Sequence, residues 1–240
     1  MTAEEILKGA GAPITKDIAD RLAEYNDLVM DATKKMNITA LRRADESLIK
    51  NVYDSLTVYH APFFPEGGRL LDLGTGAGFP GVPLAILRPD MKVFLMDSIE
   101  KKLRFIEEAA GQMKITNVTC LHVRAEEAGK RRKMRETFDV VTARAVKALP
   151  VVAEWALPLV KVGGVFAAMK GPRVWDELAD SGKIIALLGG KVEGKKKLTL
   201  PTGENRIILY IRKEKPSPKS YPRKIGFAER NPIIGPAPKE

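Results

Sequence analysis

A glycine-rich turn after an apolar segment is the part of this sequence with the clearest chemical meaning. Residues 70–81 read LLDLGTGAGFPG, an apolar strand that ends near Asp72 and runs into closely spaced glycines. Because Gly74, Gly76 and Gly78 lack Cβ atoms, the backbone can adopt conformations that other residues avoid, and a ligand can approach the main chain closely. A turn of this kind between a strand and a helix is typical of a site for a nucleoside-bearing cofactor.

Two cofactor classes are compatible with the turn. Residues 76–81 match the dinucleotide pattern G-x-G-x-x-G, in which the first glycine closes the strand and the helix N-terminus binds a pyrophosphate. Here the pattern begins two residues after Gly74, the residue that leaves the strand. The carboxylate of Asp72 would repel a pyrophosphate, whereas it suits the ammonium group of S-adenosylmethionine. The turn therefore favours S-adenosylmethionine, and a structural turn without a ligand is the alternative.

A second acidic residue, Asp97, ends the next apolar segment, 93–97. It follows the first segment by roughly 20 residues, the spacing at which such folds bind the hydroxyl groups of a ribose. In the alternative interpretation, Asp97 or Ser98 only starts the helix that we expect through Glu108. We favour ribose binding, because the glycine-rich turn precedes it at the right distance.

The segment Arg124-Ala125-Glu126-Glu127 follows a third apolar segment, 119–123. Taken alone it is an ordinary helix start. In a methyltransferase this turn lies beside the adenine, where main-chain groups bind the edge of the base. Ala125 and Glu126 are therefore candidate cofactor residues.

Net charge is +10 with a pI near 9.6, and the basic residues are clustered. Any single cluster is more often a solvated surface than a binding site. Several clusters beside a nucleoside-cofactor motif favour RNA or DNA over a small-molecule substrate. The clusters are Lys130 to Lys133 with Arg135, Lys195 to Lys197, and the tail residues Lys213, Lys215, Lys219, Arg223 and Lys224.

Composition excludes several classes of protein. The apolar runs are of strand length and fall short of the roughly 20 residues that a membrane span requires, so no membrane partner is predicted. The N-terminus lacks a basic-then-apolar signal segment, so export is not expected. A single cysteine, Cys120, and two histidines, His60 and His122, argue against a disulfide framework and a metal site.

Apolar periodicity predicts the elements that position these residues. Helices are expected from a Thr15 cap to about Lys35 and from an Asp45 cap to about Tyr59. Alternating strands and helices then predict a parallel sheet covered on both faces. The final two strands are separated by Pro201-Thr202-Gly203, which leaves room only for a hairpin. The expected strands are 69–73, 92–96, 118–123, 138–143, 164–169, 191–200 and 206–213.

The predicted fold class is α/β: a Rossmann-like class I methyltransferase with a mostly parallel seven-stranded sheet and a C-terminal antiparallel hairpin. We expect a helical N-terminal extension over residues 1–66 and the cofactor-binding domain over 67–213. Residues 214–240 are rich in proline and basic residues and are expected to form an extended tail on the domain or on its partner.

Two basic residues end later strands, Arg144 after 140–143 and Lys170 after 167–169. Open α/β sheets bind their ligands at the carboxyl ends of the strands. Arginine can donate in a fixed fork to a base edge or a phosphate. Arg144 and Lys170 are therefore candidates for positioning the substrate.

The ordered set of motifs resembles the bacterial small-subunit ribosomal RNA guanine-N7 methyltransferases, the glucose-inhibited division protein B family. The resemblance extends from about residue 20 to the C-terminus and has one departure: members often carry histidine shortly before Asp54-Ser55-Leu56, where this chain has Asn51. The motifs are Asn37-Ile38-Thr39-Ala40, Asp54-Ser55-Leu56, the Gly74 to Gly81 turn, Asp97-Ser98 with Lys101-Lys102, Arg124-Ala125-Glu126-Glu127, Thr142-Ala143-Arg144-Ala145, Met169-Lys170-Gly171 and Tyr221-Pro222-Arg223-Lys224.

This resemblance implies a cytoplasmic enzyme that methylates a guanine in the 530 loop of 16S rRNA, in naked RNA or in the small ribosomal subunit. It places cofactor contacts on Gly74, Phe79, Ala125, Glu126 and Arg144. Guanine N7 carries an in-plane lone pair and no proton at neutral pH, so no general base and no metal are expected. We expect a monomer. A methyltransferase for another substrate and a non-catalytic ribosome assembly factor are the alternatives.

Overall fold

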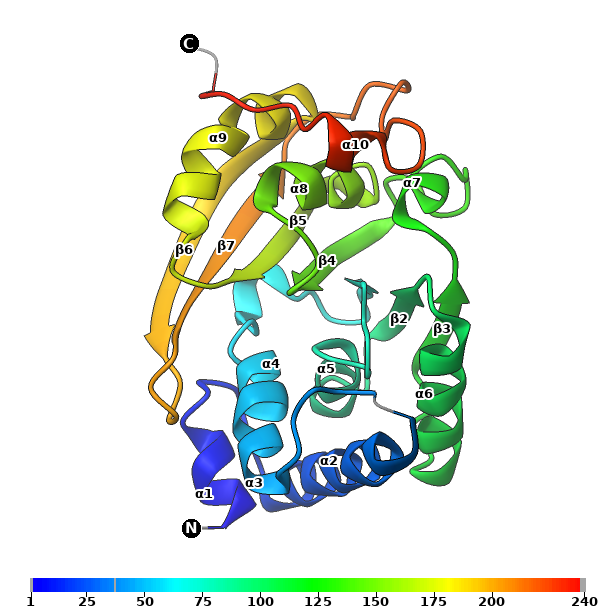
Figure 1. Ribbon diagram of the computed structural model, residues 1–240, viewed down its shortest axis with the longest axis vertical. Helices are drawn as coiled ribbons and strands as arrows, with labels where there is room; N and C mark the ends of the chain where they lie inside the picture. Colours follow the sequence, from blue (N-terminus) through cyan, green and yellow to red (C-terminus); the bar gives the residue numbers. More distant parts are fainter. Residues whose placement is uncertain (1, 37, 238–240) are drawn as a thin grey trace. The chain divides into compact units, whose positions relative to one another are not determined.

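The computed structural model describes residues 2–36 and 38–237 (Figure 1). Asn37, the first residue of the Asn-Ile-Thr-Ala motif, lies outside the described residues. The chain divides into two compact units. The first comprises Met1–His122 with Thr199–Glu204, and the second comprises Val123–Leu198 with Asn205–Glu240. The predicted domain boundaries, with an N-terminal extension ending at residue 66 and a cofactor-binding domain ending at residue 213, stay a prediction.

Described strands of the first unit form a parallel array in the order β3-β2-β1. In the register, Asp72 lies opposite Leu95 and Asp97 lies opposite His122, so the strands end at one edge. The strands are Arg69–Leu73 (β1), Lys92–Asp97 (β2) and Val118–His122 (β3). The helices are Ala3–Lys8 (α1), Lys16–Met36 (α2), Ala44–Ser47 (α3), the π-helix Leu48–Tyr53 (η1), Asp54–Leu56 (α4), the 3-10 helix Ala61–Phe63 (η2), Gly81–Leu87 (α5) and Glu100–Gln112 (α6).

Helix α2 forms as its apolar spacing predicts. Thr15 Oγ1 accepts a hydrogen bond from Ile18 N at 3.3 Å, which confirms the predicted cap. Leu22, Tyr25 and Val29 are fully buried along one stripe of the helix. Helix α2 contacts α5 and α6, the two helices that follow β1 and β2 (Figure 1).

The second predicted helix also forms, but Asp45 does not cap it. Helix α3 begins at Ala44, and Asp45 lies in its first turn. The guanidinium of Arg43 donates to Asp45 from Nε at 3.1 Å, so the carboxylate pairs with the residue that precedes the helix. The chain then continues through η1 and α4 to Leu56. The cap prediction was wrong because the helix begins at Ala44, which leaves Arg43 in the N-cap position and Asp45 inside the first turn.

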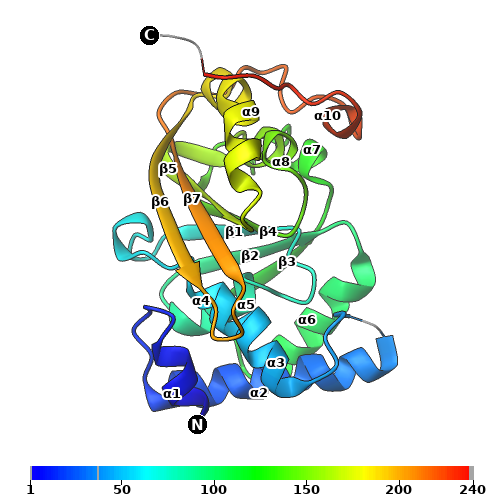
Figure 2. The same cartoon turned by 60° about the vertical axis from the view of Figure 1, so that its left-hand side comes forward.

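Described strands of the second unit follow the order β4-β5-β7-β6. Phe138–Arg144 (β4) and Val160–Lys170 (β5) are parallel, and Asn205–Lys213 (β7) runs antiparallel to β5. Gly190–Thr199 (β6) and β7 make the predicted hairpin (Figure 2). The seven described strands thus confirm the mostly parallel, mixed sheet. The helices are Ala125–Ala128 (α7), Leu149–Ala156 (α8), Val174–Leu187 (α9) and Phe227–Arg230 (α10).

The segment after β7 is built into the second unit by buried polar contacts. Arg135 donates to the carbonyl oxygens of Ser217 and Tyr221, each at 2.7 Å. Lys213 is fully buried and donates to Leu157 O at 2.9 Å, to Leu188 O at 2.8 Å and to Ser217 Oγ. Burial lowers the pKa of Lys213 to about 8.

Three residues of the basic clusters are therefore used internally. Arg135 and Lys213 hold the segment after β7, and Arg223 binds the buried carboxylate of Glu154. The contribution of the remaining cluster residues to RNA binding stays a prediction, because charge counted along a sequence does not distinguish a solvated side chain from one that satisfies buried acceptors.

Among residues 2–36 and 38–237, no helix has both the length and the apolar character that a bilayer span demands.

Candidate cofactor and substrate site

In the first unit, the glycine-rich turn is held by the main chain and by one carboxylate of β2. Gly74 N and Thr75 N both donate to Met96 O, at 2.8 and 3.0 Å. Gly76 N donates to Asp97 Oδ2 at 2.9 Å. Gly74 and Gly76 have φ values of +72° and +60°, in the left-handed region that favours glycine. The turn is therefore a fixed loop whose glycines are required by its backbone conformation.

The glycines of the turn differ in what surrounds them. A Cβ on Gly76 would meet no described atom within 4 Å, so this position faces open space. A Cβ on Gly78 would lie 2.2 Å from Tyr25 Oη, and one on Gly81 would lie 2.1 Å from Leu95 Cδ2. Gly76 is thus the glycine beside which a ligand can approach the chain, whereas Gly78 and Gly81 permit close packing inside the protein.

Tyr25 of α2 supports the turn from within the core. Its hydroxyl donates to Ala77 O at 2.9 Å, and its ring packs edge-on against Phe79 with centroids 5.7 Å apart. Burial raises the pKa of Tyr25 well above its usual range, so the hydroxyl stays a donor. The role of Tyr25 was not predicted, although it shares the apolar stripe of α2 with Leu22 and Val29. A hydroxyl on a stripe that must be buried was the signal that it needed a partner.

Asp72 holds the turn to the helix that follows it. The residue is fully buried, and its Oδ2 accepts from Thr75 Oγ1 at 2.6 Å and from Gly81 N at 2.8 Å. Gly81 is the first residue of α5, so the carboxylate lies at the positive end of that helix. Contact between Asp72 and the ammonium group of a cofactor stays a prediction.

Asp97 uses both carboxylate oxygens within the first unit. Oδ2 accepts from Gly76 N, and Oδ1 accepts from Ile99 N at 2.9 Å, one residue before α6 begins. Neither Asp97 nor Ser98 is the N-cap of α6, which is Ile99, so Asp97 joins the glycine turn to the chain that leads into α6. Each carboxylate oxygen has two lone pairs, so Asp97 retains acceptor capacity for a ribose.

We expect replacement of Asp97 with alanine to weaken S-adenosylmethionine binding by about 1–3 kcal/mol, because a hydrogen-bonded partner is removed. Calorimetry should compare the native cofactor with an analogue that lacks the ribose hydroxyls. If Asp97 binds the ribose, the affinity difference between the two ligands disappears in the variant. If the difference persists at its wild-type size, Asp97 only holds the turn and the chain before α6 in place.

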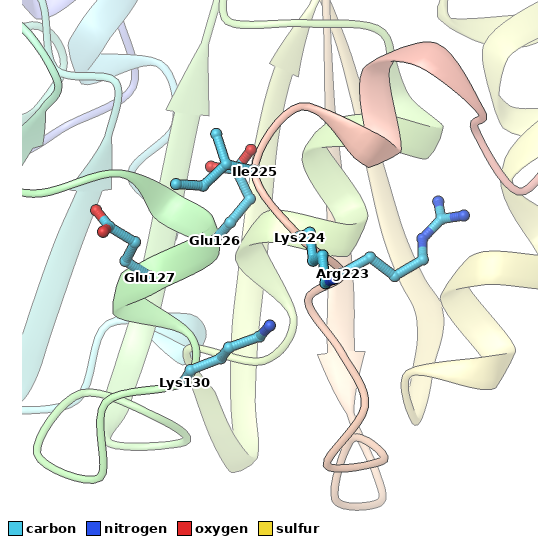
Figure 3. Close-up of a pocket in the computed structure, with 6 residues that line it drawn as sticks. All are labelled: Glu126, Glu127, Lys130, Arg223, Lys224 and Ile225. Atoms are coloured by element: carbon cyan, nitrogen blue, oxygen red, sulfur yellow. The ribbon is translucent and has the colours of Figure 1, made fainter.

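In the second unit, the predicted adenine residues lie on α7. Glu126 is buried, and its Oε1 accepts from Gly226 N at 3.0 Å. Beside α7 is a pocket of about 390 Å³, in which Arg223 points away from Glu126 (Figure 3). Glu126 thus holds the C-terminal segment, and its main chain remains the part proposed for adenine. The pocket is lined by Glu126, Glu127, Lys130, Arg223, Lys224 and Ile225.

Arg144 and Lys170 end the neighbouring strands β4 and β5, where Arg144 lies opposite Met169. Lys170 Nζ donates to Lys147 O at 2.6 Å and to Glu177 Oε2 at 2.7 Å. The same oxygen of Glu177 accepts from Leu149 N at 2.7 Å. These bonds tie the loop after Arg144 to β5 and α9.

Ala145 directly follows Arg144 and has a φ of +54°, an unfavourable conformation for a residue with a Cβ. Lys170 and Glu177 bond to main-chain atoms of this loop, at Lys147 O and Leu149 N, and so hold the loop in place. Glu177 was not predicted, because Leu149, whose amide donates to it, lies 28 residues away in the sequence. Lys170 is placed to hold the loop rather than to reach a phosphate. Its contact with substrate stays a prediction.

A nucleoside cofactor is compatible with the residues of the turn, since Gly76 leaves main chain open to contact and Asp97 lies hydrogen-bonded to it. Within residues 2–36 and 38–237, no group of three or more His, Cys, Asp or Glu side chains is placed to bind one metal ion.

Comparison with known proteins gives concordant matches. A protein-family model described as rRNA small subunit methyltransferase G matches residues 18–206. A ribosomal RNA small subunit methyltransferase G from Alkaliphilus oremlandii is 39% identical over 97% of this chain and 100% of its own length. One of the same name from Lactobacillus johnsonii is 40% identical over 96% of this chain and 98% of its own length.

Solved structures share the fold at low sequence identity. TYW2 from M. jannaschii, in complex with AdoMet, has a TM-score of 0.52 and 14% identity, and the match covers 68% of this chain and 76% of that chain. A 16S rRNA (adenine(1408)-N(1))-methyltransferase from Catenulisporales acidiphilia has a TM-score of 0.51 and 19% identity over 63% of this chain and 87% of that chain. These matches confirm the Rossmann-like methyltransferase fold.

Proposed function

The chain belongs to the rRNA small subunit methyltransferase G family, and from this premise we propose that it transfers a methyl group from S-adenosylmethionine to N7 of a guanine in the 530 loop of 16S rRNA. The observation that supports the cofactor assignment is the turn at Gly76. A Cβ there would face open space, and the Gly76 amide donates to Asp97. The choice of guanine N7 and of the 530 loop rests on the resemblance to the family.

We assign direct cofactor contacts to the main chain at Gly74 and Gly76 and to the carboxylate of Asp97. S-adenosylmethionine supplies a methyl group on a sulfonium ion, which is already activated for transfer. Asp72, Gly78 and Phe79 are buried and keep the turn in shape, and their predicted contacts with the cofactor remain part of the proposal. In the second unit, we assign adenine recognition to the main chain of Ala125 and Glu126.

On the substrate side, we assign to Arg144 the positioning of the guanine or a flanking phosphate, since a guanidinium donates to both. Arg144 also remains a candidate cofactor contact through the resemblance to the family. Lys170 is a positioning residue that acts through the loop after Arg144. Because the attacking nitrogen carries no proton, alignment and close approach supply the rate acceleration that a base would otherwise provide.

Incubation with labelled S-adenosylmethionine and 16S rRNA at several stages of subunit assembly tests the proposal. We expect one labelled guanine, and mapping locates it. Label in another RNA or in a small molecule would reassign the substrate, and cofactor binding without transfer at any stage would indicate an assembly factor. The same series identifies naked RNA or an assembled particle as the preferred substrate. We infer a cytoplasmic enzyme, because its proposed substrate is ribosomal RNA; the monomeric state stays a prediction.

The rate of the chemical step is expected to be nearly flat between about pH 6 and 9, because neither the nucleophile nor an arginine titrates in this range. Arg144→Ala should lower the single-turnover rate without introducing a new pH dependence. Single-turnover measurements at saturating cofactor and RNA give the profile. A rate that rises tenfold per pH unit toward an apparent pKa near 7 would indicate a general base and contradict attack by N7.

A further inference from the structure

An exposed tryptophan lies against two lysines at the edge of the sheet in the second unit. Trp175 is the second residue of α9, and 37% of it is exposed. Lys197 Nζ lies 4.6 Å from the centroid of its ring, and Lys195 Nζ lies 5.4 Å from it. Both lysines belong to β6, the last strand in the described order. A large aromatic surface and two cations are thus gathered at one exposed place.

Side chains of β6 alternate between an exposed and a half-buried face, and the exposed face is basic. Lys191, Lys195 and Lys197 share the exposed face, on which residues two apart lie roughly 6.8 Å apart. Glu193 lies on the same face, but Arg212 neutralises it at 2.6 Å. Lys196 points to the other face, where burial lowers its pKa. The cluster 195–197 of the sequence is therefore split, and only Lys195 and Lys197 flank the indole ring.

Lysines on an edge strand commonly serve to prevent pairing with the edge of another sheet. This role would explain Lys195 and Lys197 but does not require an exposed aromatic residue beside them. The interaction of a lysine with an exposed aromatic ring favours the contact over separation by only about two- to fivefold. Stacking of a nucleic-acid base on an aromatic side chain increases the binding affinity on the order of five- to a hundredfold. A base can therefore displace the ammonium groups from the ring, which then become available to neighbouring phosphates.

We propose that Trp175, Lys195 and Lys197 form a stacking platform for a single-stranded segment of the RNA substrate. The proposal rests on the proposed function, since it assigns part of the same RNA to a surface. A base stacks on the indole ring, and the two ammonium groups bind phosphates on either side of it. The net charge of +10 gives the long-range attraction that such a surface needs.

Binding of in vitro transcribed 16S rRNA should be measured by filter binding across a potassium chloride series. We expect Trp175→Ala to weaken binding by about 10- to 100-fold and Trp175→Phe to retain most of it, because stacking requires only an aromatic face. Lys195→Ala with Lys197→Ala should reduce the log–log salt slope by about 1.4, or about 0.7 per lost phosphate contact. Lys196→Ala is the matched control, because it removes the same charge from the opposite face of the same strand.

Single-turnover methylation separates the platform from the catalytic proposal. We expect the Trp175→Ala and double-lysine variants to need more RNA for half-maximal rate, to reach the wild-type rate at saturation and to bind S-adenosylmethionine normally. Wild-type affinity in Trp175→Ala, or a salt slope in the double-lysine variant equal to that of Lys196→Ala, would overturn the platform while leaving the methyltransferase assignment intact. Loss of binding confined to protein-containing particles would indicate a protein contact and would overturn it as well. If the wild type binds 16S rRNA through Trp175 but transfers no methyl group to any assembly stage, the proposed function fails and the platform stands.

Discussion

Replacement of Gly76 with leucine is expected to abolish S-adenosylmethionine binding while the protein remains folded. A Cβ added at Gly76 meets no described atom within 4 Å, so the substitution strains the backbone but its Cβ causes no clash inside the protein. The same side chain would occupy the space beside the main chain where we place the cofactor. Overlap that cannot relax costs on the order of 3 kcal/mol, and we therefore expect at least about a 100-fold loss of affinity.

Gly67→Leu is the matched control for this variant. Gly67 has a φ of +63°, close to the +60° of Gly76, and a Cβ there also meets no described atom within 4 Å. Both variants should lose about 1–2 kcal/mol of stability from the left-handed backbone. Calorimetry with S-adenosylhomocysteine, run beside thermal melting, measures both effects. Equal cofactor affinities in the two variants would contradict the placement of the cofactor at Gly76, and tight NAD binding by the wild type with no response to S-adenosylhomocysteine would contradict its identity.

Replacement of Arg223 with alanine is expected to destabilise the protein by about 3 kcal/mol, the lower end of the range for breaking a buried ion pair. Glu154 is only 1% exposed, and Arg223 donates to it from Nε at 2.9 and 3.0 Å and from a terminal nitrogen at 2.6 Å. The variant leaves a buried carboxylate without its counter-ion. The loss is limited because Arg223 N continues to donate to Glu154 Oε1 at 2.9 Å.

Chemical denaturation followed by circular dichroism measures this effect, with two comparisons. Lys224→Ala removes the same charge from the adjacent, exposed residue and should change stability by less than about 0.5 kcal/mol. Glu154→Gln combined with Arg223→Ala should recover part of the loss, because no unpaired charge remains buried. If Arg223→Ala destabilises no more than Lys224→Ala, the segment after β7 is not anchored by this pair.

Local signals were sufficient for most elements of the fold. The strand predicted over 69–73 is observed as Arg69–Leu73, and the hairpin follows from the short connection at Pro201-Thr202-Gly203. Apolar runs, glycines and a threonine cap act through neighbours in the sequence, so the sequence alone carries them. The same holds for the glycine turn and for Asp97, whose spacing places it beside Gly76.

Only the tertiary structure decided how the charged and polar side chains are used. Arg135 meets Tyr221 and Arg223 meets Glu154 across long separations in the sequence, and Glu177 accepts from Leu149 N, 28 residues away. A lysine or arginine has the same sequence signature whether it is solvated or satisfies a buried acceptor, since burial is set by distant segments. For that reason the sequence by itself determined the fold and the family, whereas folding determined which cations are left for RNA.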